Sequence, residues 1–143
     1  MNDPITHYKK FTIEINQIGL KDSEFIILGT AINETTTHNG HKYIAEELEK
    51  ASPGLKGKPL LKDHKNEVDA IVGMVTNSYF DRKNKSIEFE AKVTDKSIRE
   101  KIEQGVLSKV SICAFAQDLV KEESTGNLIA KGLEIVELSF TPV

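Results

Sequence analysis

Two residues of this 143-residue chain have the chemistry of a hydrolytic site. Ser111 lies inside the apolar run VSICAF at positions 110–115, and His64 follows Asp63 in a Lys-rich segment. A serine hydroxyl becomes a strong nucleophile when a neighbouring imidazole accepts its proton, and the imidazole needs a third group to orient it, either a carboxylate or a second histidine. The pair predicts nucleophilic hydrolysis, with the third group left open. The alternative is a small polar strand residue and a surface histidine.

Cys113 is a rival nucleophile, because side chains two residues apart in a strand share a face with each other. A thiolate paired with His64 would define a cysteine hydrolase. A lone cysteine in an apolar strand is more often a core residue. Since the chain has one cysteine, an internal disulfide and a Cys-cluster zinc site are excluded, and packing must stabilise the fold.

His38 and His41 are candidate metal ligands that Asp63 or His64 would have to complete. Their spacing matches no zinc framework, and the Asn-Gly pair between them favours a solvated turn. A basic stretch without interleaved aromatic residues favours a solvated loop over phosphate binding. We therefore expect neither a metal nor a cofactor. The lysines of this stretch are Lys56, Lys58, Lys62 and Lys65.

The elements that must position these residues are mostly strands. Residues 11–15 alternate apolar and polar side chains, and residues 24–31 form a more continuous apolar run. Residues 42–51 place apolar side chains on one face, which predicts a short amphipathic helix that ends at Pro53-Gly54. Residues 54–66 are expected to form a loop around a short apolar piece, so that His64 lies near a strand end or in a loop.

The second half of the chain predicts a hairpin, a helix and further strands. Residues 70–80 and 86–93 flank a polar turn and form the hairpin. Thr94 or Asp95 caps a helix that stops at Gly105. The remaining segments are a strand, a polar turn and one or two final β segments, and hairpin-like spacing favours an antiparallel sheet or a partly closed barrel. These segments are residues 109–116, 121–127 and 128–140.

Length and composition restrict the classes of protein to which this chain can belong. A chain of 143 residues with 38% hydrophobic and 29% charged residues predicts a single folded domain over residues 1–143. The net charge of −3 provides no positive field for nucleic acid or an anionic membrane. The longest aliphatic stretch, at residues 25–28, is far shorter than a membrane span, and the polar N-terminus has no signal-peptide core. We expect a soluble, intracellular protein.

The order of the chain's motifs resembles that of the prohead (capsid maturation) serine protease family of tailed phages, distant relatives of the herpesvirus assemblins. The motifs are GKPLLKDH at 57–64, VGMV at 72–75, a hairpin, a helix over 98–105, VSI at 110–112 and ELS at 137–139. The resemblance covers about residues 25–143, and its specificity lies in the combined order. It implies an α+β, mainly antiparallel β fold: an assemblin-like, partly closed β-barrel flanked by short helices.

The resemblance also assigns roles to residues. The family's histidine after a Gly-x-Pro-Leu-type segment is the general base and corresponds to His64, while the strand serine is the nucleophile and corresponds to Ser111. Assemblins place a second histidine after the serine, but all four histidines here precede Ser111, so the third member must be a carboxylate. The phage-type Glu-Leu/Ile-Ser pattern selects Glu137. Glu134 is the alternative, and regular alternation puts it on the opposite face. The carboxylates after Ser111 are Asp118, Glu122, Glu123, Glu134 and Glu137.

The resemblance implies a serine endopeptidase that cleaves the scaffold or the capsid-protein propeptide during viral procapsid maturation, with self-cleavage. The expected substrates are the capsid scaffold and the major capsid protein, and the expected setting is the procapsid inside the host cytoplasm. We expect no nucleic-acid partner and no membrane, and a homo-oligomer is left open. Backbone N–H groups of residues 117–127 are the expected oxyanion donors.

Two features depart from the family pattern. Cys113 stands where the family usually has glycine, which narrows the space beside Ser111. This departure supports the alternative of a catalytically inactive capsid- or scaffold-associated module with the same fold, whereas retention of all three candidate site residues speaks against it. The chain stops at Val143, where relatives usually continue into a tail removed by self-cleavage, so we expect a truncated or processed C-terminus.

Overall fold

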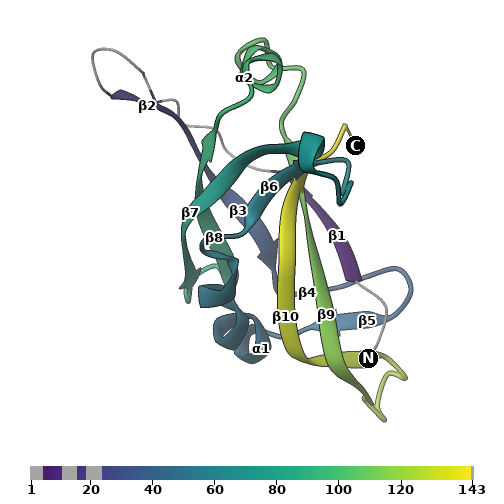
Figure 1. Ribbon diagram of the computed structural model, residues 1–143. Helices are drawn as coiled ribbons and strands as arrows, with labels where there is room; N and C mark the ends of the chain where they lie inside the picture. The colour runs from purple at the N-terminus through teal and green to yellow at the C-terminus, as the bar shows by residue number, and fades with distance from the viewer. Residues whose placement is uncertain (1–4, 11–15, 19–23, 143) are drawn as a thin grey trace.

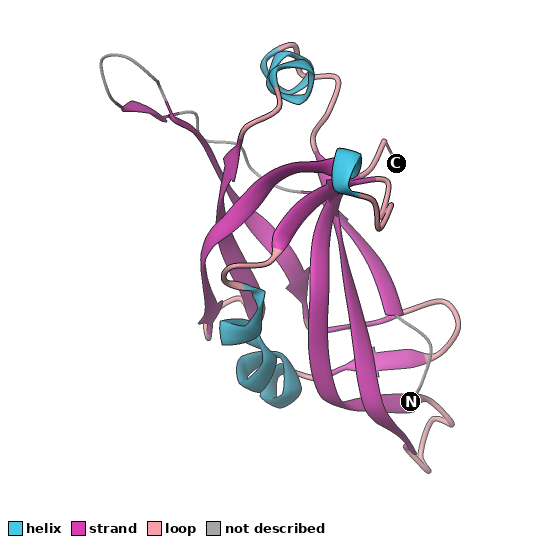
Figure 2. Ribbon diagram, in the orientation of Figure 1, coloured by secondary structure: helices cyan, strands magenta, loops and turns pink. Residues whose placement is uncertain are grey.

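The structure of the chain, a computed structural model, describes residues 5–10, 16–18 and 24–142. Most of these residues lie in strands, with a few short helical segments at the margins (Figure 2). The strand predicted over residues 11–15 falls outside the described residues. In chain order the described strands are β1 (Ile5–Lys10), β2 (Asn16–Ile18), β3 (Glu24–Asn33), β4 (Thr35–Thr36), β5 (His41–Tyr43), β6 (Pro59–Lys62), β7 (Ile71–Asp81), β8 (Ser86–Val93), β9 (Lys109–Lys121) and β10 (Leu128–Phe140).

These strands form one sheet that curls into a half-open barrel (Figure 1). The order across the sheet is β1-β9-β10-β6-β7-β8-β3-β2, and the β4–β5 pair extends it beside β10. All neighbours along this path are antiparallel except β10 and β6, which run parallel. The mainly antiparallel, partly closed barrel predicted from the sequence is therefore confirmed. The parallel pair matters for the site, because it brings the ends of β6 and β10 together.

The helices flank the barrel and begin and end at recognisable signals. The α-helices are α1 (Ala45–Ala51) and α2 (Lys96–Glu103), and short 3₁₀ turns cover Ser52–Leu55 and Val68–Ala70. The Asp95 side chain accepts a hydrogen bond from the Ile98 backbone N–H at 3.0 Å, which confirms the predicted N-terminal cap. None of the described helices is long and apolar enough to cross a membrane.

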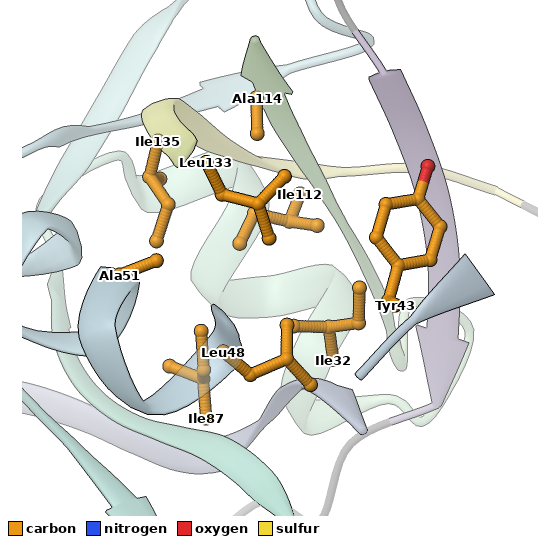
Figure 3. A pocket seen from close by; sticks show the side chains of 9 residues that line it. All are labelled: Ile32, Tyr43, Leu48, Ala51, Ile87, Ile112, Ala114, Leu133 and Ile135. Atoms are coloured by element: carbon orange, nitrogen blue, oxygen red, sulfur yellow. The ribbon is translucent and has the colours of Figure 1, made fainter. Parts of the chain in front are cut away.

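The inner face of the barrel holds the core, against which α1 packs. Complete burial of each large apolar side chain contributes roughly 1.5–3 kcal/mol to stability. One small apolar cavity of about 20 Å³ remains between α1 and the sheet (Figure 3). It is close to the size of one water and has an apolar lining, so it is a packing void and not a ligand site. The largest fully buried side chains include Tyr43, Phe89, Phe140, Ile27, Leu48 and Leu55.

Some predicted boundaries were wrong because of tertiary pairing. The helix expected over residues 42–51 begins at Ala45, since His41–Tyr43 is β5, which pairs with β4 and β10. Pro53 does not end the helical segment but lies inside the 3₁₀ turn Ser52–Leu55. The strand expected over residues 109–116 continues to Lys121, where the hairpin with β10 turns. The hairpin of β7 and β8 lies where the sequence predicted it.

Candidate active site

The turn that follows β6 carries His64 in an unusual backbone conformation. Asp63 and His64 have φ values of +54° and +55°, in the left-handed region that costs non-glycine residues about 1–3 kcal/mol each. Two hydrogen bonds to β10 hold this turn. The Asp63 backbone N–H donates to the Phe140 carbonyl at 2.9 Å, and the His64 backbone N–H donates to Ser139 Oγ at 2.9 Å. The end of β10 thus fixes the backbone from which the His64 ring projects.

Ser111 lies on the outer face of β9, opposite the core. Its neighbours Val110 and Ile112 point into the core, and strand alternation turns Ser111 the other way. The Ser111 hydroxyl lies 2.8 Å from His64 Nε2, and the whole residue is fully buried. A substrate carbonyl can therefore reach Ser111 Oγ only when some of the atoms that cover this residue move.

Glu137 completes a line of three side chains on the same outer face. Its Oε1 contacts Nδ1 of His64, the ring nitrogen that faces away from Ser111. The Glu137 side chain is 7% exposed and that of His64 is 20% exposed. The Glu137 Oε2 is also buried and has no hydrogen-bond partner among the described residues. The three residues that the sequence selected therefore lie together, joined through the His64 ring.

A β-bulge at Val136 places Glu137 on this face and corrects one expectation. Regular alternation predicted that Glu134 and Glu137 face opposite sides, but the β9–β10 register shifts between Ile135 and Glu137. Glu134 is paired with Phe115 and Glu137 with Cys113, so both glutamates face outward. The prediction was wrong because the bulge adds one residue to β10 without a partner on β9. Glu134 is exposed, whereas Glu137 is buried at the His64 ring.

This arrangement can activate a hydroxyl. When Nδ1–H of a neutral His64 donates to Glu137, the Nε2 lone pair is available to accept the Ser111 proton. The imidazolium that forms would be stabilised by the nearby carboxylate, in a site with little exposed surface. The geometry therefore suits base-assisted nucleophilic attack by the Ser111 oxygen.

Cys113 shares the outer face with Ser111, as the sequence predicted, but its environment disfavours a thiolate. It is partly buried and pairs across the sheet with Glu137. Burial raises the pKa of the Cys113 thiol above its ordinary value of 9.0, and the negative charge of Glu137 raises this pKa further. The thiolate is the reactive form of cysteine, so at neutral pH Cys113 is a poor nucleophile.

A cleft of about 510 Å³ opens on the outer face beside His64 and Glu137. Its walls come from β6, β7, β9, β10 and the segment between β6 and β7, and they are mostly apolar. Ile71 is half exposed and Val68 is almost fully exposed, so two aliphatic side chains of the lining face solvent. The lining residues are Pro59, Leu61, His64, Asn66, Glu67, Val68, Ile71, Cys113, Phe115, Val136 and Glu137.

The expected oxyanion donors of residues 117–127 do not reach the site. At about 3.3 Å per residue, Gln117 lies roughly 20 Å along β9 from Ser111, and the following turn is farther still. That turn is tied to β5 instead, where Lys42 Nζ pairs with Glu122 at 3.0 Å. The expectation was wrong because β9 runs past Ala116, where the sequence ended it.

The other candidate ligands lie elsewhere in the fold. His41 lies in β5 and His38 in the turn that joins β4 to β5, where Thr37 Oγ1 donates to the His41 carbonyl at 3.2 Å. Among the residues that the structure describes, no group of three or more His, Cys, Asp or Glu side chains could hold a metal ion. Lys62 and Lys65 are exposed at the edges of the His64 turn.

Sequence reasoning assigned no role to two features of the site. Ser139 appeared only as part of the motif ELS, yet its side chain accepts the hydrogen bond from the His64 backbone. Its position two residues after Glu137 was the available signal, because a regular strand puts both on one face. The cleft residues Ile71, Phe115 and Val136 come from three different strands, and no spacing in the sequence links them.

Fold and site together define a half-open β-barrel with a Ser–His–Glu line on its outer face. Among solved structures, the chain is similar to the bacteriophage T4 capsid assembly protease gp21, with a TM-score of 0.68 and 16% sequence identity. The match covers 97% of this chain and 98% of that chain. No family model and no curated protein sequence matches the chain. The predicted likeness to a phage prohead protease is thus confirmed at the level of the fold.

Proposed function

We propose that this chain is a serine endopeptidase of viral procapsid maturation, in which Ser111 is the nucleophile, His64 the general base and Glu137 the carboxylate that orients it. One observation carries the proposal: the His64 ring joins Ser111 Oγ and Glu137 through its two nitrogens. The fold shared with a capsid assembly protease supports the reaction class.

The proposed reaction follows from the positions of the three side chains. Ser111 Oγ attacks the scissile carbonyl carbon while His64 Nε2 takes the hydroxyl proton, and Glu137 stabilises the resulting imidazolium. The tetrahedral intermediate then collapses, the C–N bond breaks, and His64 gives its proton to the leaving amine. Water repeats the sequence on the acyl-enzyme: His64 takes a proton from it, and the ester bond to Ser111 breaks to release the new carboxyl end.

The proposed substrates are the capsid scaffold and the propeptide of the major capsid protein, cleaved inside the procapsid in the host cytoplasm, together with the enzyme's own chain. The mostly apolar cleft beside His64 is the proposed binding site for the substrate peptide. Its apolar walls can take apolar side chains of a peptide, and its edge includes His64 and Glu137. The structure of gp21, a capsid assembly protease, supports this choice of substrates.

Co-expression with the scaffold and major capsid precursors of the same virus tests the proposal. Intact-mass spectrometry should find cleaved precursors with the wild-type chain and uncleaved precursors with Ser111→Ala or His64→Ala, because the members of such a triad act as a unit. Ser108→Ala, at an exposed serine three residues before the candidate nucleophile, is the matched control and should cleave as the wild type does. Wild-type processing by Ser111→Ala would contradict the serine assignment.

A non-catalytic capsid- or scaffold-associated module is the second candidate, favoured by the full burial of Ser111. Cys113, which lies beside it in place of the family's usual glycine, supports the same candidate. The same co-expression separates the two candidates. If the wild-type chain binds the precursor without cleaving it, and Ser111→Ala behaves in the same way, the chain is a capsid- or scaffold-associated module. The same result would exclude the protease.

A further inference from the structure

We propose that Ser139 is a positioning residue for His64: its hydroxyl oxygen holds the His64 backbone in the conformation from which the ring reaches both Ser111 and Glu137. This inference rests on the proposed function, because positioning has catalytic consequences only if the three residues act together. Ser139 is fully buried, and its Oγ accepts the His64 backbone N–H at 2.9 Å. Ser139 acts through His64 and is not itself assigned to the reaction.

The hydrogen bond matters because the backbone departs from the regular β6–β10 ladder at this point. Asp63 and His64 are consecutive residues with positive φ, so the chain leaves the β6–β10 pairing as it enters the turn. The Asp63 N–H still reaches a backbone acceptor, the carbonyl of Phe140. The next N–H, that of His64, finds its acceptor in a side chain. Loss of this acceptor would remove the side-chain link between β10 and the His64 backbone.

The place of Ser139 in the sheet connects the two halves of the site. On one side Ser139 pairs directly with Ser111 across the β9–β10 ladder. On the other side it pairs with Leu61 of β6, three residues before His64. Because Ser139 lies between the strand of the nucleophile and the strand that leads to the base, its contact with His64 sets the distance between them. The positive φ values alone would not set that distance, since they describe the local backbone and not the position of His64 relative to β10. The Asp63 N–H bond to Phe140 holds the turn one residue earlier, and the Ser139 bond acts on His64 itself.

A buried serine elsewhere provides the matched control. Ser52 is 4% exposed, lies in the 3₁₀ turn after α1 and not in the cleft lining, and its Oγ donates to the Glu49 carbonyl at 2.9 Å. Ser52→Ala therefore removes a buried hydroxyl and one hydrogen bond to the backbone without touching the His64 turn. A general loss of stability would affect both variants, whereas loss of positioning would affect only the Ser139 variants.

The experiment compares Ser139→Ala, Ser139→Cys, Ser139→Thr and Ser52→Ala, each assayed well below its melting temperature on a peptide that spans the cleavage site mapped in the precursor. We expect kcat to fall roughly 10- to 100-fold for Ala and Cys, with KM within about twofold of wild type, because small misplacement of a catalytic group is costly. Thr keeps a hydroxyl acceptor and should restore most of kcat. Cys keeps the volume but is a weak acceptor, so it tests the hydrogen bond even if Ala does not fold.

A second measurement does not depend on activity. The proton that His64 Nδ1 shares with Glu137 should give a downfield ¹H resonance in wild type, Ser139→Thr and Ser52→Ala, and this resonance should shift or disappear in the Ala and Cys variants. Wild-type kcat or an unchanged resonance in a folded Ala or Cys variant would overturn the inference. If the wild-type chain cleaves nothing, the proposed function fails, while the resonance still decides whether Ser139 positions His64.

Discussion

The two ring nitrogens of His64 contact different side chains and therefore have different roles in the proposed reaction. Nδ1 contacts Glu137 and Nε2 contacts Ser111. In the proposed site the carboxylate therefore orients the neutral ring and keeps its proton on Nδ1. In such an arrangement the orienting group contributes less to the rate than the nucleophile does, because the nucleophile forms the new bond. The side chains therefore differ in the size of effect that their removal should cause.

Replacement of Glu137 tests this ranking. Glu137→Gln should lower kcat/KM by about 10²- to 10⁴-fold and should retain more activity than Ser111→Ala, because the amide oxygen still accepts Nδ1–H but carries no charge. Glu134→Gln, at the exposed glutamate on the same face, should be nearly silent. Steady-state kinetics on the mapped peptide gives both values. A large effect at Glu134 with a small one at Glu137 would assign the orienting role to Glu134.

The charge of Glu137 should also be visible at Cys113. Because burial and this charge raise the thiol pKa, alkylation by iodoacetamide should be slow at neutral pH and should rise with a midpoint above pH 9.0. In Glu137→Gln one of the two causes is gone, so the midpoint moves down and alkylation at pH 8 becomes faster. Mass spectrometry of timed samples measures the rate, with Glu134→Gln as the unchanged control. Equal or slower alkylation in Glu137→Gln would show that its charge does not act on the thiol.

The bulge in β10 shows what a strand pattern can and cannot predict. The alternation around Ser111 correctly placed Ser111 and Cys113 together, because β9 is regular there. The stretch Glu134 to Glu137 contains two adjacent apolar residues between two acidic ones, and a regular strand and a bulged strand fit it equally well. Only the pairing with β9 decides between them. The motif selected Glu137 as the candidate carboxylate. The pairing of β10 with β9 determines that its side chain lies on the outer face.

The cleft walls are built from four strands, because β6, β7, β9 and β10 each contribute side chains. Ile71→Asp should raise KM for the peptide by roughly tenfold with little change in kcat, because a charge in an apolar subsite costs about 1–3 kcal/mol of binding. Ile71 is 50% exposed, so the substitution leaves the core intact. Met74→Asp is the control, since Met74 is 48% exposed on the same strand outside the cleft lining. An equal KM for the two variants would place peptide binding elsewhere.

Whole-molecule topology explains why the site had to be assembled from distant segments. His64, Ser111 and Glu137 are far apart in sequence, and they meet because β6, β10 and β9 are neighbours in the sheet. Local patterns predicted the β7–β8 hairpin and the Asp95 cap, since both depend on nearby residues. They could not predict the parallel β6–β10 pair, which joins segments more than seventy residues apart. The combined order of motifs selected the three residues, and the strand pairing that brings them together came from the structure.

The chain and gp21 are alike in fold and differ in most side chains. The chain and gp21 share nearly their whole length at 16% identity, so the barrel is common to both while most side chains differ. The proposed activity of this chain therefore rests on its own three residues and on access to the fully buried Ser111. A test of function must accordingly report on the Ser111 hydroxyl itself.

The most direct measurement is covalent labelling with a serine-directed phosphonate, followed by peptide mapping, in a preparation whose peptide cleavage is followed in parallel. We predict one adduct at Ser111, formed as activity is lost, absent from Ser111→Ala, strongly slowed in His64→Ala and retained in Cys113→Ser. Loss of activity with the adduct on another residue, or full loss of cleavage in folded Cys113→Ser while Ser111→Ala remains active, would contradict the assignment of Ser111 as the nucleophile.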